Sequence, residues 1–333
     1  DWAAGIDVAS QNDDRMEFGQ VAQAFGEDAI NGSLRVDQTE DVLSAGPFAQ
    51  IGIAPNDRIR FTAGVRWDYY DFKAGDRKLD DGDQSGDRTM DAVSPSVGVT
   101  VAAAPNINLF ANFATAYETP TTVELSNTPT GVGGFNQELE PQDLRSFEIG
   151  ARGLIAPVRL RYEVAVYFST VDNALVSFQN PLSQDFFRNA GKSSRDGVEL
   201  LLEWVPHASF NTRFAYTYQD FVFEEFNTGS NDFSGNKEPG APPHRMFAGF
   251  NYTTPFGLRS GATVRWVDEF FVRNDNTVSN WAYTVIDLRF GFDAKWGDVN
   301  VRPFVGIDNL GGVRYNSSAI VNAFGGRYYE PSP

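Results

Sequence analysis

The chain has 333 residues, with 27 Lys and Arg against 44 Asp and Glu, so its formal net charge is −17. This acidic balance argues against a nucleic-acid partner, because phosphates are bound by basic surfaces. The absence of Cys excludes a disulfide framework, a thiolate metal site and a Cys nucleophile. The sequence also has no apolar run of roughly 18 residues, so no transmembrane helix is expected.

The first strong pattern along the chain is "RIRFTAGVRWDYY" at residues 58–70. Odd-numbered positions carry apolar side chains such as Phe61 and Trp67, whereas even-numbered positions carry polar ones such as Arg66 and Asp68. Strict alternation of this kind predicts a β-strand with one apolar face and one polar face.

The same alternation returns in many later segments. Clear examples are residues 107–117, 158–168, 198–204, 210–218 and 286–296. We count about 13 or 14 such segments, many of them roughly 10–15 residues long, whereas strands of soluble proteins average about 5–6 residues. Helical periodicity is nearly absent, so the predicted fold class is all-β.

The connections between these segments differ at the two strand ends. Short turns alternate with long polar stretches along the chain. The short turns are at 55–57, 105–106, 156–157, 206–208, 255–257 and 297–298. The long polar stretches are at 11–43, 73–90, 119–143, 222–243 and 269–280. Tight turns at one end and long loops at the other are typical of outer-membrane barrels. The tryptophans form two groups: near the long loops are Trp67, Trp266 and Trp281, and near the short turns are Trp204 and Trp296. Two aromatic girdles, one at each membrane interface, would give this distribution.

We therefore predict a transmembrane, antiparallel, up-and-down β-barrel whose polar face lines the lumen and whose apolar face contacts lipid. The alternative is a soluble β-sandwich or propeller in which the apolar faces pack on each other. Soluble cores are mostly aliphatic and do not usually keep Arg and Glu throughout the opposing face. A barrel hydrolase using His207 or His244 would need a Ser and an acid nearby. We predict no catalytic residue and no enzyme activity.

Several quoted blocks resemble a known family. "NLFANFATAYETPTTVEL" (108–125), "GVGGFNQELEPQ" (131–142) and "SFEIGARG" (146–153) resemble the β-barrel region of TonB-dependent outer-membrane receptors, particularly ferric-siderophore receptors. "FVGIDNLGGVRYN" (304–316) and "GGRYYEPSP" (325–333) are similar to the approach to the family's last strands. The resemblance covers nearly the whole chain and is most specific at residues 117–150.

The resemblance implies that residues 1–333 are part of a larger barrel. Members have about 22 strands around a plugged lumen, with an N-terminal plug domain, a TonB box and an aromatic terminal strand that find no match here. We expect a partial barrel domain, its C-terminal part, with the plug absent. Because lipid does not tolerate unpaired strand edges, we also expect the protein to be longer at both ends.

The function implied by the resemblance is energised import of a scarce ligand through the bacterial outer membrane, most often a ferric siderophore. The implied partners are the TonB-ExbB-ExbD energy-coupling complex, reached through the missing plug, outer-membrane lipid and a small-molecule ligand. We expect a monomer without a resident cofactor or metal. The alternatives are TonB-dependent uptake of a non-iron cofactor such as cobalamin or a quinone, and a passive porin.

Candidate ligand-binding residues come from the polar faces near the long loops. The predicted set for the upper lumen and loops is Arg66, Asp68, Glu118, Phe135, Arg145, Arg245, Arg265 and Asp268. Lumenal Arg side chains suit an anionic ferric siderophore, because they form bidentate, charge-assisted hydrogen bonds. Alternatively, these side chains pair with one another or hold the plug. Loop aromatics, which also include Phe187, Phe226 and Phe233, could grip an apolar or catecholate ligand or simply pack the loops.

Two other loop motifs carry less weight. "DRKLDDGDQSGDRTMD" (76–91) could hold Ca²⁺ through its carboxylates, but the spacing misses the EF-hand pattern, so a solvated loop is favoured. "GVGGFN" (131–136) resembles a phosphate-binding loop only in its glycines, because no strand–turn–helix context surrounds it.

Overall fold

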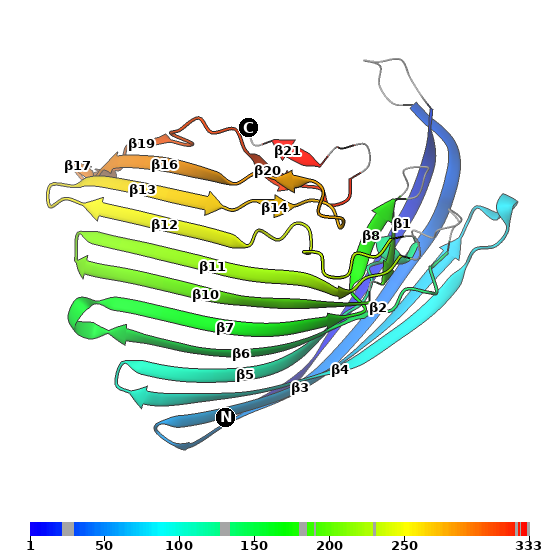
Figure 1. Ribbon diagram of the computed structural model, residues 1–333, viewed down its shortest axis with the longest axis horizontal. Helices are drawn as coiled ribbons and strands as arrows, with labels where there is room; N and C mark the ends of the chain where they lie inside the picture. Colours follow the sequence, from blue (N-terminus) through cyan, green and yellow to red (C-terminus); the bar gives the residue numbers. More distant parts are fainter. Residues whose placement is uncertain are drawn as a thin grey trace.

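The computed structural model describes residues 1–21, 30–126, 134–179, 185–189, 191–228, 231–323, 326 and 328–331. Within these residues the main feature is a 13-stranded sheet in which neighbours along the chain pair in antiparallel fashion. Figure 1 shows the strands side by side in a strongly curved sheet, with tight turns at one end and long connections at the other. We call the end with the long connections the upper end. The predicted up-and-down β architecture is confirmed.

The sheet follows the chain in order. Its strands are β1 (Trp2–Val21), β2 (Ile30–Asn56), β3 (Ile59–Asp76), β4 (Gly86–Ala104), β5 (Ile107–Glu118), β6 (Gln142–Ile155), β7 (Leu160–Asp172), β10 (Lys192–His207), β11 (Phe210–Glu225), β12 (His244–Thr253), β13 (Leu258–Val267), β16 (Tyr283–Phe292) and β19 (Phe304–Ile307).

Smaller elements lie in the connections. Two-stranded pairs are formed by β8 (Leu175–Gln179) with β9 (Asp185–Asn189), β14 (Phe270–Phe271) with β15 (Ser279–Asn280), β17 (Ala294–Trp296) with β18 (Val299–Val301), and β20 (Asn316–Ala319) with β21 (Tyr329–Pro331). The helical elements are η1 (Leu79–Asp81), α1 (Thr122–Ser126) and η2 (Ala156–Val158). Among the described residues, no helix has the length and apolar character needed to cross a membrane.

The register aligns apolar residues into continuous rows on the outer face. One such row crosses five neighbouring strands, with one residue from each: Val99 of β4, Ala111 of β5, Ile149 of β6, Val166 of β7 and Val198 of β10. Large apolar side chains of this face are exposed, among them Phe61, Val65, Val97, Leu109, Phe113, Phe147, Phe168, Phe250 and Phe290. No described element packs over them, so this face requires lipid as its solvent.

The polarity of the two faces reverses partway along β3. Up to Tyr69 the outward side chains are mainly apolar, but Asp71 and Lys73 continue the same face with polar groups. Phe72 and Ala74 point inward, with 2% and 5% of their surface exposed. The 18 residues of β3 reach about 60 Å at ~3.3 Å per residue, about twice the hydrocarbon core of a bilayer. The strand therefore rises out of the lipid near Tyr69.

Two of the stretches expected to be long polar loops are largely strand. β1 extends to Val21 and β2 starts at Ile30, so most of residues 11–43 is paired, and β3 and β4 take up much of 73–90. That prediction was wrong because the outward apolar signal ends at the lipid boundary, while the backbone hydrogen-bond ladder continues above it.

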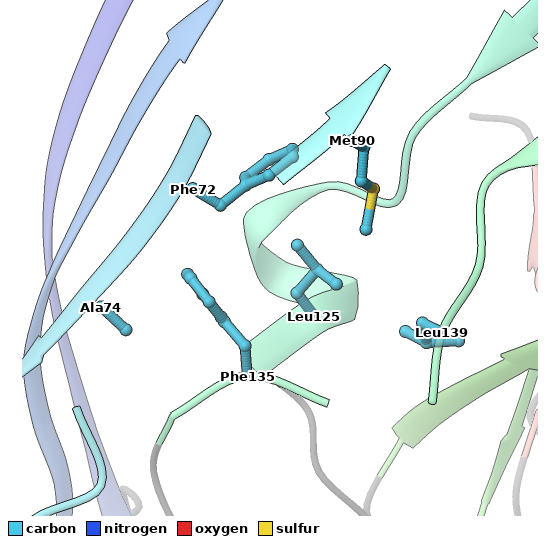
Figure 2. Close-up of a cluster of buried hydrophobic side chains, with 6 residues drawn as sticks. All are labelled: Phe72, Ala74, Met90, Leu125, Phe135 and Leu139. Carbon is cyan, nitrogen blue, oxygen red and sulfur yellow. The ribbon is translucent and has the colours of Figure 1, made fainter. Parts of the chain in front are cut away.

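A buried cluster fills the inner side of this raised wall. We call it the upper cluster; it consists of Phe72, Ala74, Met90, Leu125, Phe135 and Leu139. Figure 2 shows Leu125 on helix α1 converging with Phe135 and with Phe72 of β3. The connection between β5 and β6 therefore folds back into the barrel wall instead of standing out in water.

Helix α1 is fixed at its start by a capping box. The Glu124 carboxylate accepts a hydrogen bond from the Thr121 backbone N–H at 2.7 Å, and the Thr121 hydroxyl accepts one from the Glu124 N–H at 3.3 Å. Pro120 and Leu125 are fully buried on either side of it. The "ETPTTVEL" part of the family motif thus encodes the inward fold of this connection.

Candidate functional site

On the inner wall, Arg66 sits in a closed ion-pair network. Its guanidinium donates to Asp7 on β1 at 2.6 Å and to Asp68 on its own strand at 2.7 Å. It lies against Gly46 of β2, where a Cβ atom would come within 2.0 Å of the Arg66 Nη2 atom. The charge of Arg66 is therefore already compensated by the wall itself.

A different arrangement occurs at the upper ends of β12, β13 and β16. Arg265 donates to Asp287 at 3.2 Å, and Asp287 also accepts hydrogen bonds from the Thr263 hydroxyl at 3.1 Å and the Asn309 N–H at 2.9 Å. Arg245 on the neighbouring strand is exposed. None of the described carboxylates lies within ion-pair distance of it. Among the residues that the structure describes, it is a cation of the upper lumen without an acidic partner.

Two stacked phenol rings lie beside these guanidinium groups. The rings of Tyr283 and Tyr315 are 4.7 Å apart between centroids, with 26° between their planes. Both Arg245 and Arg265 lie within electrostatic range of the Tyr283 hydroxyl. We name Arg245, Arg265, Tyr283 and Tyr315 the inner patch.

The strand register explains how the inner patch forms. Val267 of β13 lies opposite both Arg245 and Tyr283, so these two side chains flank it on the inner face. The polar residues of β13 and β16 that share this face include Arg265 and Asp287. Cationic groups next to stacked rings can hold a planar anionic ligand through charge-assisted hydrogen bonds and ring contacts.

The remaining polar candidates lie around the upper rim. Glu118, at the upper end of β5, accepts a hydrogen bond from the Gln142 side chain. Asp268 follows β13; its N–H donates to the His244 carbonyl at 3.0 Å, and its carboxylate accepts from the Glu269 N–H at 2.8 Å. Both carboxylates therefore stabilise the local backbone or side-chain arrangement.

The candidates do not converge on one place. Arg245 and Arg265 lie on adjacent strands, whereas Arg66 and Asp68 belong to β3, with six strands between β3 and β12. With seven inter-strand spacings of ~4.8 Å each, this separation is about 34 Å along the wall. The inner patch and the Arg66 network are thus distinct sites.

Two candidates lie elsewhere than predicted. Phe135 has 7% of its surface exposed and meets the Phe72 ring edge-on at 6.4 Å, so it belongs to the interior of the upper cluster. Arg145 shares the outer face of β6 with the exposed Phe147 and pairs with Asp172 at 3.7 Å. The family motif located both residues along the chain but did not indicate the face on which each would lie.

The Asp-rich connection between β3 and β4 uses its carboxylates internally. Asp76 accepts hydrogen bonds from the backbone N–H groups of Lys78 and Gln84, each at 2.9 Å. The Lys78 ammonium contacts Asp80 and Asp81 at 2.7 Å and holds the pKa of the Asp80 carboxyl below its usual range. Within the described part of the chain, no group of His, Asp and Glu could hold a metal ion.

Sequence reasoning missed the aromatic half of the inner patch. In the sequence, Tyr315 stands out only as part of the motif at 304–316, and Tyr283 has no distinguishing neighbour. Only the register that places Tyr283 beside Arg245, across Val267, could reveal their proximity.

Residues 1–310 match the family described as TonB dependent receptor-like, beta-barrel. The chain belongs to this family. Its barrel wall, with a lipid-facing apolar band and a polar inner face, places the receptor in the bacterial outer membrane.

The receptor is similar in sequence to named siderophore and metal-complex receptors. It is 26% identical over 328 residues to the metal-pseudopaline receptor CntO of Pseudomonas aeruginosa (strain UCBPP-PA14), covering 96% of this chain and 41% of that protein. It is 27% identical over 267 residues to the ferrioxamine B receptor of Salmonella typhimurium (strain SL1344), covering 78% of this chain and 35% of that protein. The chain therefore spans well under half the length of these relatives.

Solved structures confirm the fold. The siderophore receptor PiuA from Acinetobacter baumannii superposes with a TM-score of 0.80 at 18% identity, covering 99% of this chain and 51% of that one. The unliganded ferric citrate transporter FecA gives a TM-score of 0.79 at 16% identity, covering 98% and 49%.

Proposed function

We propose that the receptor imports a ferric siderophore across the outer membrane, with residues 1–333 forming part of its barrel domain. The observation that carries this proposal is the family match over residues 1–310. Energy would come from the TonB-ExbB-ExbD complex acting through a plug domain, and the receptor would work as a monomer. Transport of this kind needs no covalent chemistry in the barrel.

We assign first contact with the ligand to the inner patch. Arg245 is exposed to the lumen and lacks a carboxylate among the described residues, so an anionic ferric chelate would supply its missing partner. Arg265 and the stacked rings of Tyr283 and Tyr315 would add a second hydrogen-bond donor and a flat apolar surface.

The other candidates receive secondary roles in this proposal. Arg66 and Asp68 are already paired within the wall, so they would support the wall or contact the plug. Glu118 and Asp268 would shape the upper rim from which the ligand enters.

A second candidate cargo is an anionic metal chelate other than a ferric siderophore. A relative covering 96% of this chain is named as a metal-pseudopaline receptor, and a cationic patch would serve either chelate. A passive porin is not favoured, because the family match is to TonB-dependent receptors.

The inner-patch assignment is tested by binding of ferric siderophores to the purified full-length receptor. Replacing Arg245 removes a charge-assisted hydrogen bond, so Arg245→Ala should weaken binding about tenfold or more. The matched control is Arg145→Ala, because Arg145 is also an exposed arginine but lies on the outer face. Equal affinities of the two variants would refute the role of the inner patch.

Uptake in an outer-membrane host tests the function itself. Labelled ferric siderophores, cobalamin and a quinone cofactor would be compared in cells with and without TonB. We expect TonB-dependent iron uptake and expression induced by iron limitation. Uptake of iron at the same rate without TonB would contradict energised import.

A further inference from the structure

The long connections at the upper end are joined to one another by asparagine side chains. The clearest junction is at Asn276, between β13 and β16. Its Oδ1 atom accepts the Lys237 N–H at 2.8 Å, and its Nδ2 atom donates to the Lys237 carbonyl at 2.9 Å. The side-chain amide thus pairs with both the backbone N–H and the backbone carbonyl of Lys237 in the β11–β12 connection, as a residue of a neighbouring strand would.

The same reciprocal geometry occurs at a second junction. Asn189, at the end of β9, accepts the Glu140 N–H at 2.7 Å and donates to the Glu140 carbonyl at 2.6 Å. Its Nδ2 atom also donates to the Asn173 carbonyl at 2.7 Å. This junction ties the β8–β9 hairpin to the connection that carries helix α1.

A third junction links the β13–β16 connection to the segment after β19. The Asn322 side chain accepts the Asn274 N–H at 3.0 Å, and the Asn322 N–H donates to the Val272 carbonyl at 2.9 Å. The Asn236 side chain donates to the Asn274 carbonyl at 2.8 Å from the opposite side. Val272 and Asn274 have 0% and 6% of their surface exposed, so this junction is an interior one.

Besides these three asparagine junctions, an apolar cluster also joins the upper connections. Ala174 and Val176, around the start of β8, pack with Phe223 and Phe226 of the β11 end. The Phe223 and Phe226 rings are 4.8 Å apart and only 3% exposed each. This cluster joins the β8–β9 hairpin to the β11–β12 connection.

At its other end the series is anchored to the barrel wall. Glu40 of β2 is 3% exposed and accepts hydrogen bonds from the Gln38 amide and from the Ser126 hydroxyl at the end of α1, each at 2.7 Å. The Gly134 N–H donates to the Gln38 side chain at 3.2 Å. A continuous set of contacts therefore runs from β2 to Asn322.

We infer that these connections form one rim that opens and closes as a single unit rather than as independent loops. Pulling one connection away would break these paired hydrogen bonds and, at the interior junction of Val272 and Asn274, would leave buried backbone groups unpaired, which is unfavourable. Opening at one junction therefore promotes opening at the next. A ligand that touches one connection would change the order of all of them.

The test is hydrogen–deuterium exchange of the full-length receptor in lipid nanodiscs, without ligand. Asn276 has a left-handed φ of 54°, so Asn276→Gly removes its side chain without adding backbone strain. We expect about tenfold faster exchange not only around Lys237 and Val272 but also in the distant segments 134–140 and 173–179. The matched control is Asn300→Ala in β18, at the opposite end of the strands, which should leave the rim unchanged.

A second variant removes the asparagine side chain at the junction between Asn189 and Glu140. Asn189→Ala, at a position without a positive φ, should accelerate exchange in residues 271–276 as well as around Glu140. Faster exchange confined to the immediate partners in both variants would overturn the inference, because independent loops would respond only locally. This readout uses no ligand, so it is independent of whether the proposed cargo is correct.

Discussion

The lower and upper parts of the same sheet place their apolar side chains on opposite faces. In the lower part, Val65 and Phe61 point outward and are about half exposed, while Arg66 is paired inside. Above Tyr69, Phe72 is buried on the inner side. The hydrogen-bonded ladder between β3 and β4 continues through this change without interruption. The surrounding solvent therefore decides which face of the strand is apolar. Lipid surrounds the lower part and water the upper part, whereas the secondary structure is the same in both.

This contrast predicts different weaknesses in the two parts. In the upper part, apolar side chains are removed from water and pack on each other, so lost volume should be costly. In the lower part, the outer side chains meet fluid lipid, so lost volume should matter little and an added charge should be costly. The following variants test this difference, from the largest expected effect to the smallest.

The largest effect is expected from a cavity in the upper cluster. Leu125→Ala should lower the free energy of unfolding by about 2–5 kcal/mol, because Leu125 is fully buried. Val123→Ala on the same helix is the control; Val123 is 55% exposed, so its effect should stay below about 0.5 kcal/mol. Denaturant unfolding of the receptor in lipid vesicles measures both. Equal effects would show that α1 does not pack as described.

A charge on the lipid-facing wall should be almost as damaging. Val164→Arg places a guanidinium near the middle of the outer row of β7, at an expected cost of about 2–4 kcal/mol. Thr89→Arg is the control, because Thr89 lies on the outer face above the boundary and opposite Asp71, where water can solvate the charge. The same unfolding experiment applies. If Val164→Arg left the free energy of unfolding unchanged while Thr89→Arg lowered it, our assignment of lipid and water to these two positions would be wrong.

The buried polar contact that ties α1 to the wall should have an intermediate effect. Glu40→Ala leaves the Gln38 amide and the Ser126 hydroxyl without their common acceptor, which should cost about 1–3 kcal/mol. Hydrogen exchange around Ser126 should rise in parallel. The control is Asp41→Ala, because Asp41 is the next residue of β2 and lies on the exposed outer face. An unchanged exchange rate at Ser126 would exclude Glu40 as the anchor of α1.

The smallest effect is expected at the boundary between the two parts. The Trp67 indole N–H donates to the Asp91 carboxylate on the outer face at 3.1 Å. Trp67→Phe keeps an aromatic ring but loses this hydrogen bond, so the expected cost is about 0.5–1.5 kcal/mol. Asp91→Asn, which keeps an acceptor at the same place, should cost less. A larger loss in Asp91→Asn would mean that the charge and not the hydrogen bond fixes the boundary.

The sequence was informative where one solvent acts along a whole strand. Alternation puts Arg66, Asp68 and Arg265 on the polar face, and the strand register places them on the inner face, because lipid imposes a strict period of two on the outer side. It failed above the boundary. There, polar outward residues in 11–43 resemble a loop, although the backbone is still paired.

The candidate site could be predicted only in part for a related reason. The polar position of Arg245 beside a long connection marks it in the sequence, but Tyr315, which stacks on Tyr283, lies far from Tyr283 in sequence and is brought close by folding. Phe135 and Arg145 were assigned from a motif that gives position along the chain. Whether a side chain is buried or faces outward depends on register and on how a connection folds back, and a motif carries neither.

The central claim is that the outer face contacts lipid up to the level of Tyr69 and water above it. The sequence contains no Cys, so the single variants Val65→Cys, Asp71→Cys and Thr62→Cys each accept one spin label. In bilayers we expect the label at position 65 to be relaxed by dissolved oxygen and shielded from a water-soluble nickel reagent. The labels at positions 71 and 62 should show the reverse. Access of the nickel reagent to position 65, equal to that at position 71, would contradict the account.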